Sequence, residues 1–140
     1  MLDHIKEFFD IPDKDIRTYS PLTLAFIGDC VYELVVRTNI VLHANQTSNE
    51  LHKESVHYVK APAQAQMVEI IKPLLTEQER EILRRGRNAS PRSTAKNASL
   101  GEYHKATGFE ALMGYLYLDG QTERMLELIR FGMQGIDSKE

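Results

Sequence analysis

The feature that most constrains the fold is a long apolar stretch from Thr23 to Arg37, which reads T-L-A-F-I-G-D-C-V-Y-E-L-V-V-R. An apolar run with no gap for a turn predicts a helix that is buried on nearly all sides. The run contains two acids, Asp29 and Glu33. A carboxylate inside such a helix loses its hydration, so it needs a cation, a hydrogen-bond donor or a proton. Glu33 is expected to pair with Arg37, one turn further along the same face.

A second stretch has the same character. Thr107 to Leu118 reads T-G-F-E-A-L-M-G-Y-L-Y-L, and its only charged residue is Glu110. If the two apolar helices pack together, Asp29 and Glu110 converge in a dry setting. Hard cations bind carboxylate oxygens and keep several waters, so this arrangement predicts a magnesium site. The residues alone leave an alternative open, in which each acid pairs with Arg, Lys or a helix N-terminus.

These strings resemble a known family. F-I-G-D-C-V-Y is similar to the ribonuclease III signature, and G-F-E-A-L-M-G-Y-L-Y-L is similar to that family's second catalytic helix. The segment R-R-G-R-N-A lies between them. No double-stranded-RNA-binding domain follows, so the chain resembles the stand-alone Mini-III ribonucleases of bacteria. The resemblance covers about Leu22 to Leu128 and implies the helical bundle of the ribonuclease III endonuclease domain.

Two positions depart from the pattern that ribonuclease III usually shows. Ala25 and Thr107 stand where that family carries two further carboxylates. The resemblance therefore implies a site with two acids, Asp29 and Glu110, as both the catalytic residues and the metal ligands. The Mini-III pattern shares this reduced set. The side chain of Thr107 is still able to hold a metal-bound water.

The activity that the resemblance implies is a Mg²⁺-dependent endoribonuclease that hydrolyses phosphodiester bonds in double-stranded RNA. It also implies a homodimer and a ribosomal RNA precursor as substrate, with maturation of large-subunit (23S) RNA. The alternative is a non-catalytic helical module that binds structured ribosomal RNA. A third interpretation is an interaction protein whose basic loop binds an acidic partner.

The 140 residues have the length of a single catalytic domain, 1–140, and a net charge of −3. The segment from Arg80 to Lys105 contrasts with this, because its seven basic residues and two acids give a local charge of +5. Such asymmetry favours a polyanionic partner, with an ordinary solvated loop as the alternative. The candidate RNA contacts are Lys53, Lys60, Arg84, Arg85, Arg87, Asn88 and Lys96.

The compartment is expected to be the cytoplasm. A single cysteine, Cys30, excludes an internal disulfide framework and is interpreted as a small core residue. No signal peptide is recognised, and Asp29, Glu33 and Arg37 make the apolar stretch too charged for a membrane span. No Gly-rich phosphate loop is present, and we expect no organic cofactor.

The predicted class is all-α, because no segment alternates with a period of two. Ser20-Pro21 predicts a helix start, and capping boxes are predicted at Thr47 and Thr76. Gly86 is interpreted as a helix stop. The region from Asn88 to Glu102 is expected to be a long loop. The predicted helices are Leu2 to Phe9, Pro21 to about Leu42, Thr47 to about Lys60, Ala63 to Leu75, Thr76 to about Arg85, Tyr103 to Leu118 and Thr122 to about Met133.

Overall fold

The protein is described by a computed structural model that covers residues 1–90 and 99–139. Every regular element in these two ranges is helical, which confirms the predicted all-α class. Two short 3₁₀ turns, η1 and η2, accompany the α-helices. The elements in chain order are α1 (Leu2–Phe8), η1 (Ile16–Thr18), α2 (Pro21–His43), α3 (Ser48–Val59), α4 (Ala61–Ile71), η2 (Lys72–Leu74), α5 (Glu77–Ala89), α6 (Leu100–Leu118) and α7 (Thr122–Asp137).

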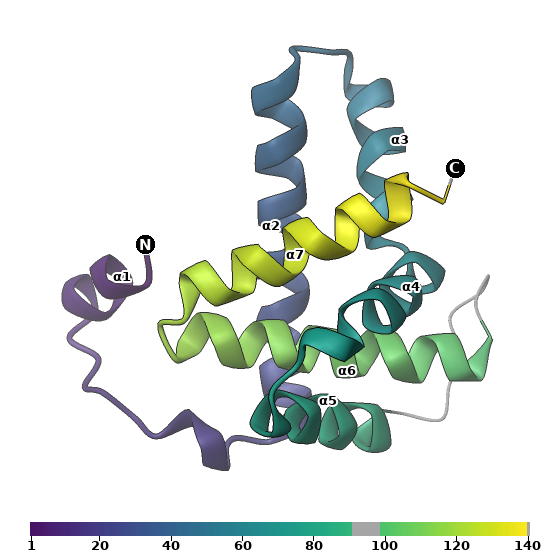
Figure 1. Ribbon diagram of the computed structural model, residues 1–140. Coiled ribbons are helices and arrows are strands. Elements are labelled where there is room, and N and C mark those ends of the chain that lie inside the picture. The colour runs from purple at the N-terminus through teal and green to yellow at the C-terminus, as the bar shows by residue number, and fades with distance from the viewer. Residues whose placement is uncertain (91–98, 140) are drawn as a thin grey trace.

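Helix α6 is the central element of the bundle. Helix α2 crosses it, α5 runs along one side, and α4 and α7 close the other sides (Figure 1). Almost every residue from Ala106 to Leu116 is buried, with half-buried Glu110 as the exception. The apolar sequence of α6 therefore reflects packing on several sides, as its pattern predicts.

Two glycines let α2 and α6 cross with their backbones in contact. A Cβ atom added to Gly28 would overlap the carbonyl oxygen of Glu110, and one added to Gly114 would overlap the carbonyl oxygen of Leu24. Helices approach this closely only where side chains are absent. This crossing determines where Asp29, the residue after Gly28, lies relative to α6.

Buried aromatic residues also hold the two helices together at this crossing. The rings of Tyr32 and Phe109 meet edge to face with centroids 4.8 Å apart. The Tyr32 hydroxyl donates a hydrogen bond to the backbone carbonyl of Tyr58 at 2.8 Å. Both rings are fully buried. Since the hydroxyl has a partner, Tyr32 joins α2, α6 and α3 without leaving a polar atom unpaired.

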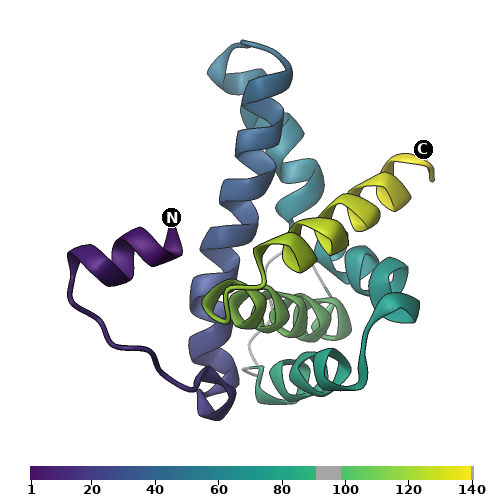
Figure 2. The ribbon, with the colours of Figure 1, turned by 60° about the vertical axis from the view of Figure 1, so that its left-hand side comes forward.

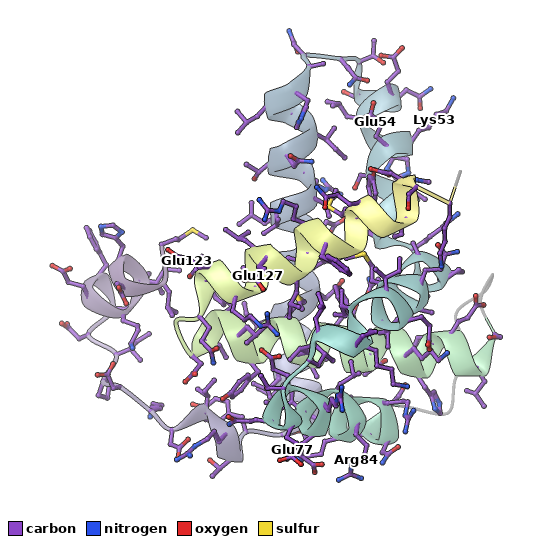
Figure 3. All side chains as sticks on the ribbon, in the orientation of Figure 1. Lys53, Glu54, Glu77, Arg84, Glu123 and Glu127 are labelled. Carbon is purple, nitrogen blue, oxygen red and sulfur yellow. The ribbon has the colours of Figure 1, made fainter. Side chains whose placement is uncertain are left out.

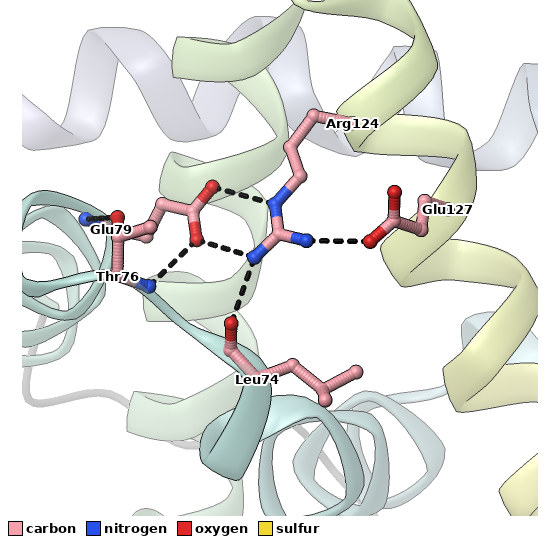
Figure 4. Close-up of polar contacts among 5 residues, drawn as sticks. All are labelled: Leu74, Thr76, Glu79, Arg124 and Glu127. Carbon is pink, nitrogen blue, oxygen red and sulfur yellow. Dashed lines mark hydrogen bonds and ion pairs between the residues drawn. The ribbon is translucent and has the colours of Figure 1, made fainter.

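An arginine joins α7 to the start of α5. Arg124 donates from Nε and Nη2 to the two carboxylate oxygens of Glu79, both at 2.9 Å, and from Nη2 to the carbonyl of Leu74 at 2.8 Å (Figure 4). Glu79 also accepts from the backbone N–H of Thr76, which completes the predicted capping box. The carboxylate of Glu79 is buried, so its charge depends on Arg124.

Two predicted boundaries around the basic segment are wrong. Gly86 does not end α5, which continues to Ala89; a Cβ there would lie 2.7 Å from the Cβ of Ala111, so Gly86 serves close packing against α6. The predicted loop is shorter at both ends, because α6 begins at Leu100 with a capping box between Ser99 and Glu102. Part of that loop, 91–98, lies outside the described residues.

Helix α2 is not buried on all sides, contrary to the prediction. Phe26 is 75% exposed, and Cys30 is exposed instead of lying in the core. The second half of α2 projects from the bundle side by side with α3 (Figure 2). Despite this apolar surface, no helix in the described part of the chain combines the length and hydropathy needed to cross a membrane.

Candidate active site

The two acids predicted to form a site come together where α2 crosses α6. Asp29 lies on the exposed side of α2 and Glu110 is half-buried on α6. The Asp29 carboxyl is within hydrogen-bonding reach of the Glu110 carboxyl. Since Gly28 already touches the backbone of Glu110, the convergence of the two side chains follows from the helix crossing itself.

The environment of Glu110 is unfavourable to its charge. Burial raises the pKa of the Glu110 carboxyl to about 8, and the neighbouring Asp29 carboxyl contributes by its charge and its hydrogen bond. A hydrogen bond from Gln64 acts in the opposite direction. Among the residues that the structure describes, no Lys or Arg forms an ion pair with Glu110, so the alternative in which this acid is salt-bridged finds no support in that part of the chain. Only Glu110 is partly buried, whereas Asp29 is exposed, so the predicted dry setting applies to one of the two acids. Together they form an acidic pair at the helix crossing.

The other acid in the apolar stretch has a structural role. Glu33 accepts a hydrogen bond from Arg37 Nη2 at 2.9 Å, as the i,i+4 spacing predicts. Arg37 is exposed and Glu33 is half-buried, and ion pairs at the surface contribute little stability. This ion pair leaves Asp29 as the acid of α2 that faces Glu110.

The two positions that lack an acid are both buried. Ala25 packs in the core, and the hydroxyl of Thr107 donates to the carbonyl of Tyr103 at 3.1 Å and lies 3.2 Å from Ser90 Oγ. The described part of the chain contains no cluster of three or more His, Cys, Asp or Glu suited to a metal ion. The site thus offers two protein carboxylates.

A magnesium ion fits this donor set. Mg²⁺ is commonly bound through one or two carboxylates while it keeps several waters. A cation would also offset the charge that makes ionised Glu110 unfavourable beside Asp29. Asp29 and Glu110 are the residues that would hold it.

The candidate RNA contacts do not all lie together. Arg84, Arg85, Arg87 and Asn88 lie on α5, where only Arg85 is partly covered. Figure 3 shows Arg84 and Lys53 at opposite ends of the molecule. Lys60 is exposed at the junction of α3 and α4, and Lys96 lies outside the described residues.

The structure adds basic residues that sequence reasoning did not select. A pocket of about 190 Å³ between α4, α5 and α6 is lined by several cations. Lys105 is already paired with Glu69 at 2.6 Å, and Arg84 hydrogen-bonds to Glu81. The spacing along α5 would have revealed Arg80, but only the fold brings Lys72 to the same pocket. The basic residues that line it are Lys72, Arg80, Arg84, Arg87 and Lys105.

Comparison with known proteins identifies the family of the chain. The Ribonuclease III domain family matches residues 22–121, which include both acids. The chain therefore belongs to the ribonuclease III family and is an endoribonuclease of its Mini-III type.

The individual relatives support the narrower assignment. The chain is 52% identical to the Mini-ribonuclease 3 of Thermoanaerobacter sp. over 89% of its own length and 87% of the relative's. It is 47% identical to the Mini-ribonuclease 3 of Symbiobacterium thermophilum over 81% of its length and 87% of the relative's. A crystal structure of a protein from Fusobacterium nucleatum has a TM-score of 0.75 and 32% identity, covering 87% of this chain and 98% of that one.

Proposed function

We propose that this endoribonuclease cuts double-stranded RNA with the help of Mg²⁺ held by Asp29 and Glu110. The observation that carries the proposal is the convergence of these two carboxylates in a setting that raises the pKa of Glu110 to about 8. When bound, the ion supplies Lewis-acid charge for phosphodiester hydrolysis. Asp29 and Glu110 bind it on the open side of the α2–α6 crossing, where a phosphate group can approach.

The protein side of the reaction is mainly positioning. Buried Phe109 and Tyr32 fix the two helices, so the carboxylates do not need to reorganise when the substrate arrives. No side chain of the described residues is needed as a nucleophile.

The RNA surface is proposed to include α5 and the chain that follows it. Arg85 and Arg87 form no ion pair with other described residues, and Asn88 adds an amide donor. Contacts of this kind bind the phosphate backbone rather than the base edges, as expected for duplex RNA, whose deep groove is closed to side chains. Lys96 and Lys60 are proposed to extend the surface, whereas Lys53 would need a substrate that reaches the α3 end.

The exposed apolar face of α2 is proposed to be the interface of a homodimer. Phe26, Cys30 and Leu34 follow one another at intervals of one turn and are all exposed. A two-fold axis along this face would place one Asp29 on each side, which suits the two strands of a duplex. A Phe26→Glu variant should then sediment as a monomer, while the matched variant Phe131→Glu on α7 stays dimeric. If Phe26→Glu leaves the oligomeric state unchanged, this interface is wrong.

The proposed substrate in the cell is the precursor of large-subunit (23S) ribosomal RNA, which the Mini-III type supports. The decisive test is cleavage of a labelled duplex RNA with Mg²⁺ and with EDTA, beside a single strand of the same sequence. We expect cleavage of the duplex only with Mg²⁺. Cleavage that survives EDTA would contradict the metal, and preference for the single strand would contradict the substrate. Depletion in cells should cause unprocessed large-subunit precursors to accumulate.

A further inference from the structure

Gln64 is a buried polar residue next to the carboxylate pair. It lies near the start of α4 and is only 3% exposed. A glutamine side chain has two N–H donors and an oxygen acceptor, and its burial is costly unless these groups have partners. Its neighbour Gln66, on the same helix, is exposed, so helix α4 does not require a buried amide for its own formation.

The amide of Gln64 connects the α3–α4 junction to the site. Its Nε2 donates to the carbonyl of Val59, the last residue of α3, at 2.8 Å. The same side chain lies beside the Glu110 carboxyl and lowers the pKa of that group, which favours its charged form. One end of the amide is therefore anchored to a backbone atom, and the amide acts on the acid of α6.

Among the residues that the structure describes, the carbonyl oxygen of Gln64 has no hydrogen-bond partner, and it is closed off from solvent. An unpaired buried acceptor costs about 1–3 kcal/mol. The amide is thus held in an orientation that does not satisfy its own groups. Such exceptions in native proteins call for an explanation, and a neighbouring functional site is a common one.

We propose that Gln64 is a positioning residue of the cation site, which holds the Glu110 carboxylate in the orientation that binds Mg²⁺. This inference rests on the proposed function, because it assumes that Asp29 and Glu110 bind the ion. Partners that orient a metal ligand are typically worth 10- to 100-fold in metal affinity. Loss of the Gln64 amide should therefore weaken Mg²⁺ binding by about 10-fold or more, while duplex RNA binding without metal stays the same.

The test compares Gln64→Met, which keeps the volume but removes both polar groups, with Gln66→Met as the matched exposed control. Metal affinity is measured without RNA by electron paramagnetic resonance with Mn²⁺ as the probe. The Mg²⁺ concentration for half-maximal cleavage is measured separately from the KM for RNA. We expect weaker Mn²⁺ binding and a higher Mg²⁺ requirement for Gln64→Met, with an unchanged KM for RNA. Gln66→Met should match wild type in all three measurements.

A second variant covers the case in which Gln64→Met does not fold. Gln64→Asn retains the amide but is one methylene too short to reach both Val59 and Glu110, so it should show the same loss of metal affinity. If the folded variants match wild type in the Mn²⁺ and Mg²⁺ titrations, the role of Gln64 is overturned, while the proposed cation site is unaffected. If wild type and Asp29→Asn bind Mn²⁺ equally, the proposed cation site fails, and the role of Gln64 fails with it.

Discussion

Gly28 on α2 lies directly against the backbone carbonyl of Glu110 on α6, so the two acid-bearing helices touch at the residue before Asp29. Their separation depends on backbone contact rather than on adjustable side chains. The distance between the two carboxylates is therefore tied to the crossing of the helices, and any change that separates the backbones also opens the site.

Gly28→Ala should destabilise the protein and abolish cleavage, because the added Cβ would overlap the carbonyl oxygen of Glu110. Overpacking against backbone is expected to cost at least about 3 kcal/mol. Gly101→Ala on α6 is the control, since nothing lies nearer to the added Cβ than 4.0 Å. That variant should be more stable than wild type by about 0.5–1 kcal/mol. Thermal melting checks both, and a Gly28→Ala protein as stable as wild type would refute the contact.

Asp29→Asn and Glu110→Gln should each abolish cleavage while the protein stays folded and binds duplex RNA. Each substitution keeps the shape but removes a charge that binds a hard cation. Because Asp29 raises the pKa of Glu110, removing either charge should leave the melting temperature of the metal-free protein unchanged or higher. Gel-shift binding, cleavage rates and melting curves are the measurements. Variants that melt far earlier, or that cut at the wild-type rate, would exclude the metal site.

Stability of the metal-free protein should fall as pH rises from 4.5 to about 8, the ordinary and the folded-state pKa values of Glu110. A raised pKa in the folded state means that the folded protein holds the Glu110 proton more tightly than the unfolded chain does. The protonated carboxyl therefore contributes its full stabilisation below the unfolded-state pKa, and this contribution is lost as the pH rises through the folded-state pKa. The Glu110→Gln variant should lack this component. Mg²⁺ binding should tighten over the same pH range, since the ion displaces the proton. Melting and calorimetric titrations across that range check both statements, and identical pH profiles for the two proteins would contradict them.

Arg124→Met should cost about 3 kcal/mol, because it leaves the buried charge of Glu79 without its partner. Arg124 lowers the pKa of Glu79 in the folded protein. The pair therefore stabilises the fold at pH values above the ordinary pKa of a glutamate, and this stabilisation is lost as the pH falls through the folded-state pKa. The exposed Arg130 on the same helix provides the control variant Arg130→Met. The double variant Glu79→Gln/Arg124→Met should recover part of the loss. Equal denaturation midpoints for Arg124→Met and Arg130→Met would argue against the pair.

Arg85→Ala and Arg87→Ala should each weaken binding to all duplexes about equally and flatten the log–log dependence on salt by about one unit. Arg84→Ala should have a smaller effect, since Arg84 already pairs with Glu81. Lys96→Ala tests the part of the segment outside the described residues, and Arg130→Ala is the basic control on α7. Fluorescence anisotropy at several salt concentrations gives the slopes. If none of the four variants in the basic segment changes the slope, RNA binds elsewhere.

The sequence was sufficient where local chemistry decides the structure. Pro21 marks the start of α2 because proline suits the first helical position, where its missing N–H needs no partner, although the Ser20 side chain makes no capping hydrogen bond. The capping box at Thr76 satisfies free N–H groups at the start of α5. The capping box at Ser99 and Glu102 was present in the sequence and would have shortened the predicted loop. Asp29 and Glu110 stand out in the sequence because an isolated charge in an apolar helix is rare, and the structure brings them together, while their role as the site stays a prediction.

The sequence alone was insufficient where the structure depends on which helix surfaces pack together. Gly86 has the sequence appearance of a helix stop, but packing against α6 requires it for a different reason. The sequence predicts a buried Cys30 because apolar residues lie on all sides of α2. In the folded single chain, however, the face of α2 that carries Cys30 has no packing partner. Gln64 has no sequence signal, since its role depends on the neighbourhood that α4 shares with Glu110.

The crossing of α2 and α6 affects when, during synthesis of the chain, activity can first appear. Asp29 and Glu110 are 81 residues apart in the chain, and closing a loop of that length costs about 4 kcal/mol of chain entropy. During synthesis α2 leaves the ribosome long before α6, and α4, α5 and α6 must all be present before the acids meet. An unfinished chain would carry only half of the proposed site, so we expect RNA cleavage to begin only after the bundle has closed.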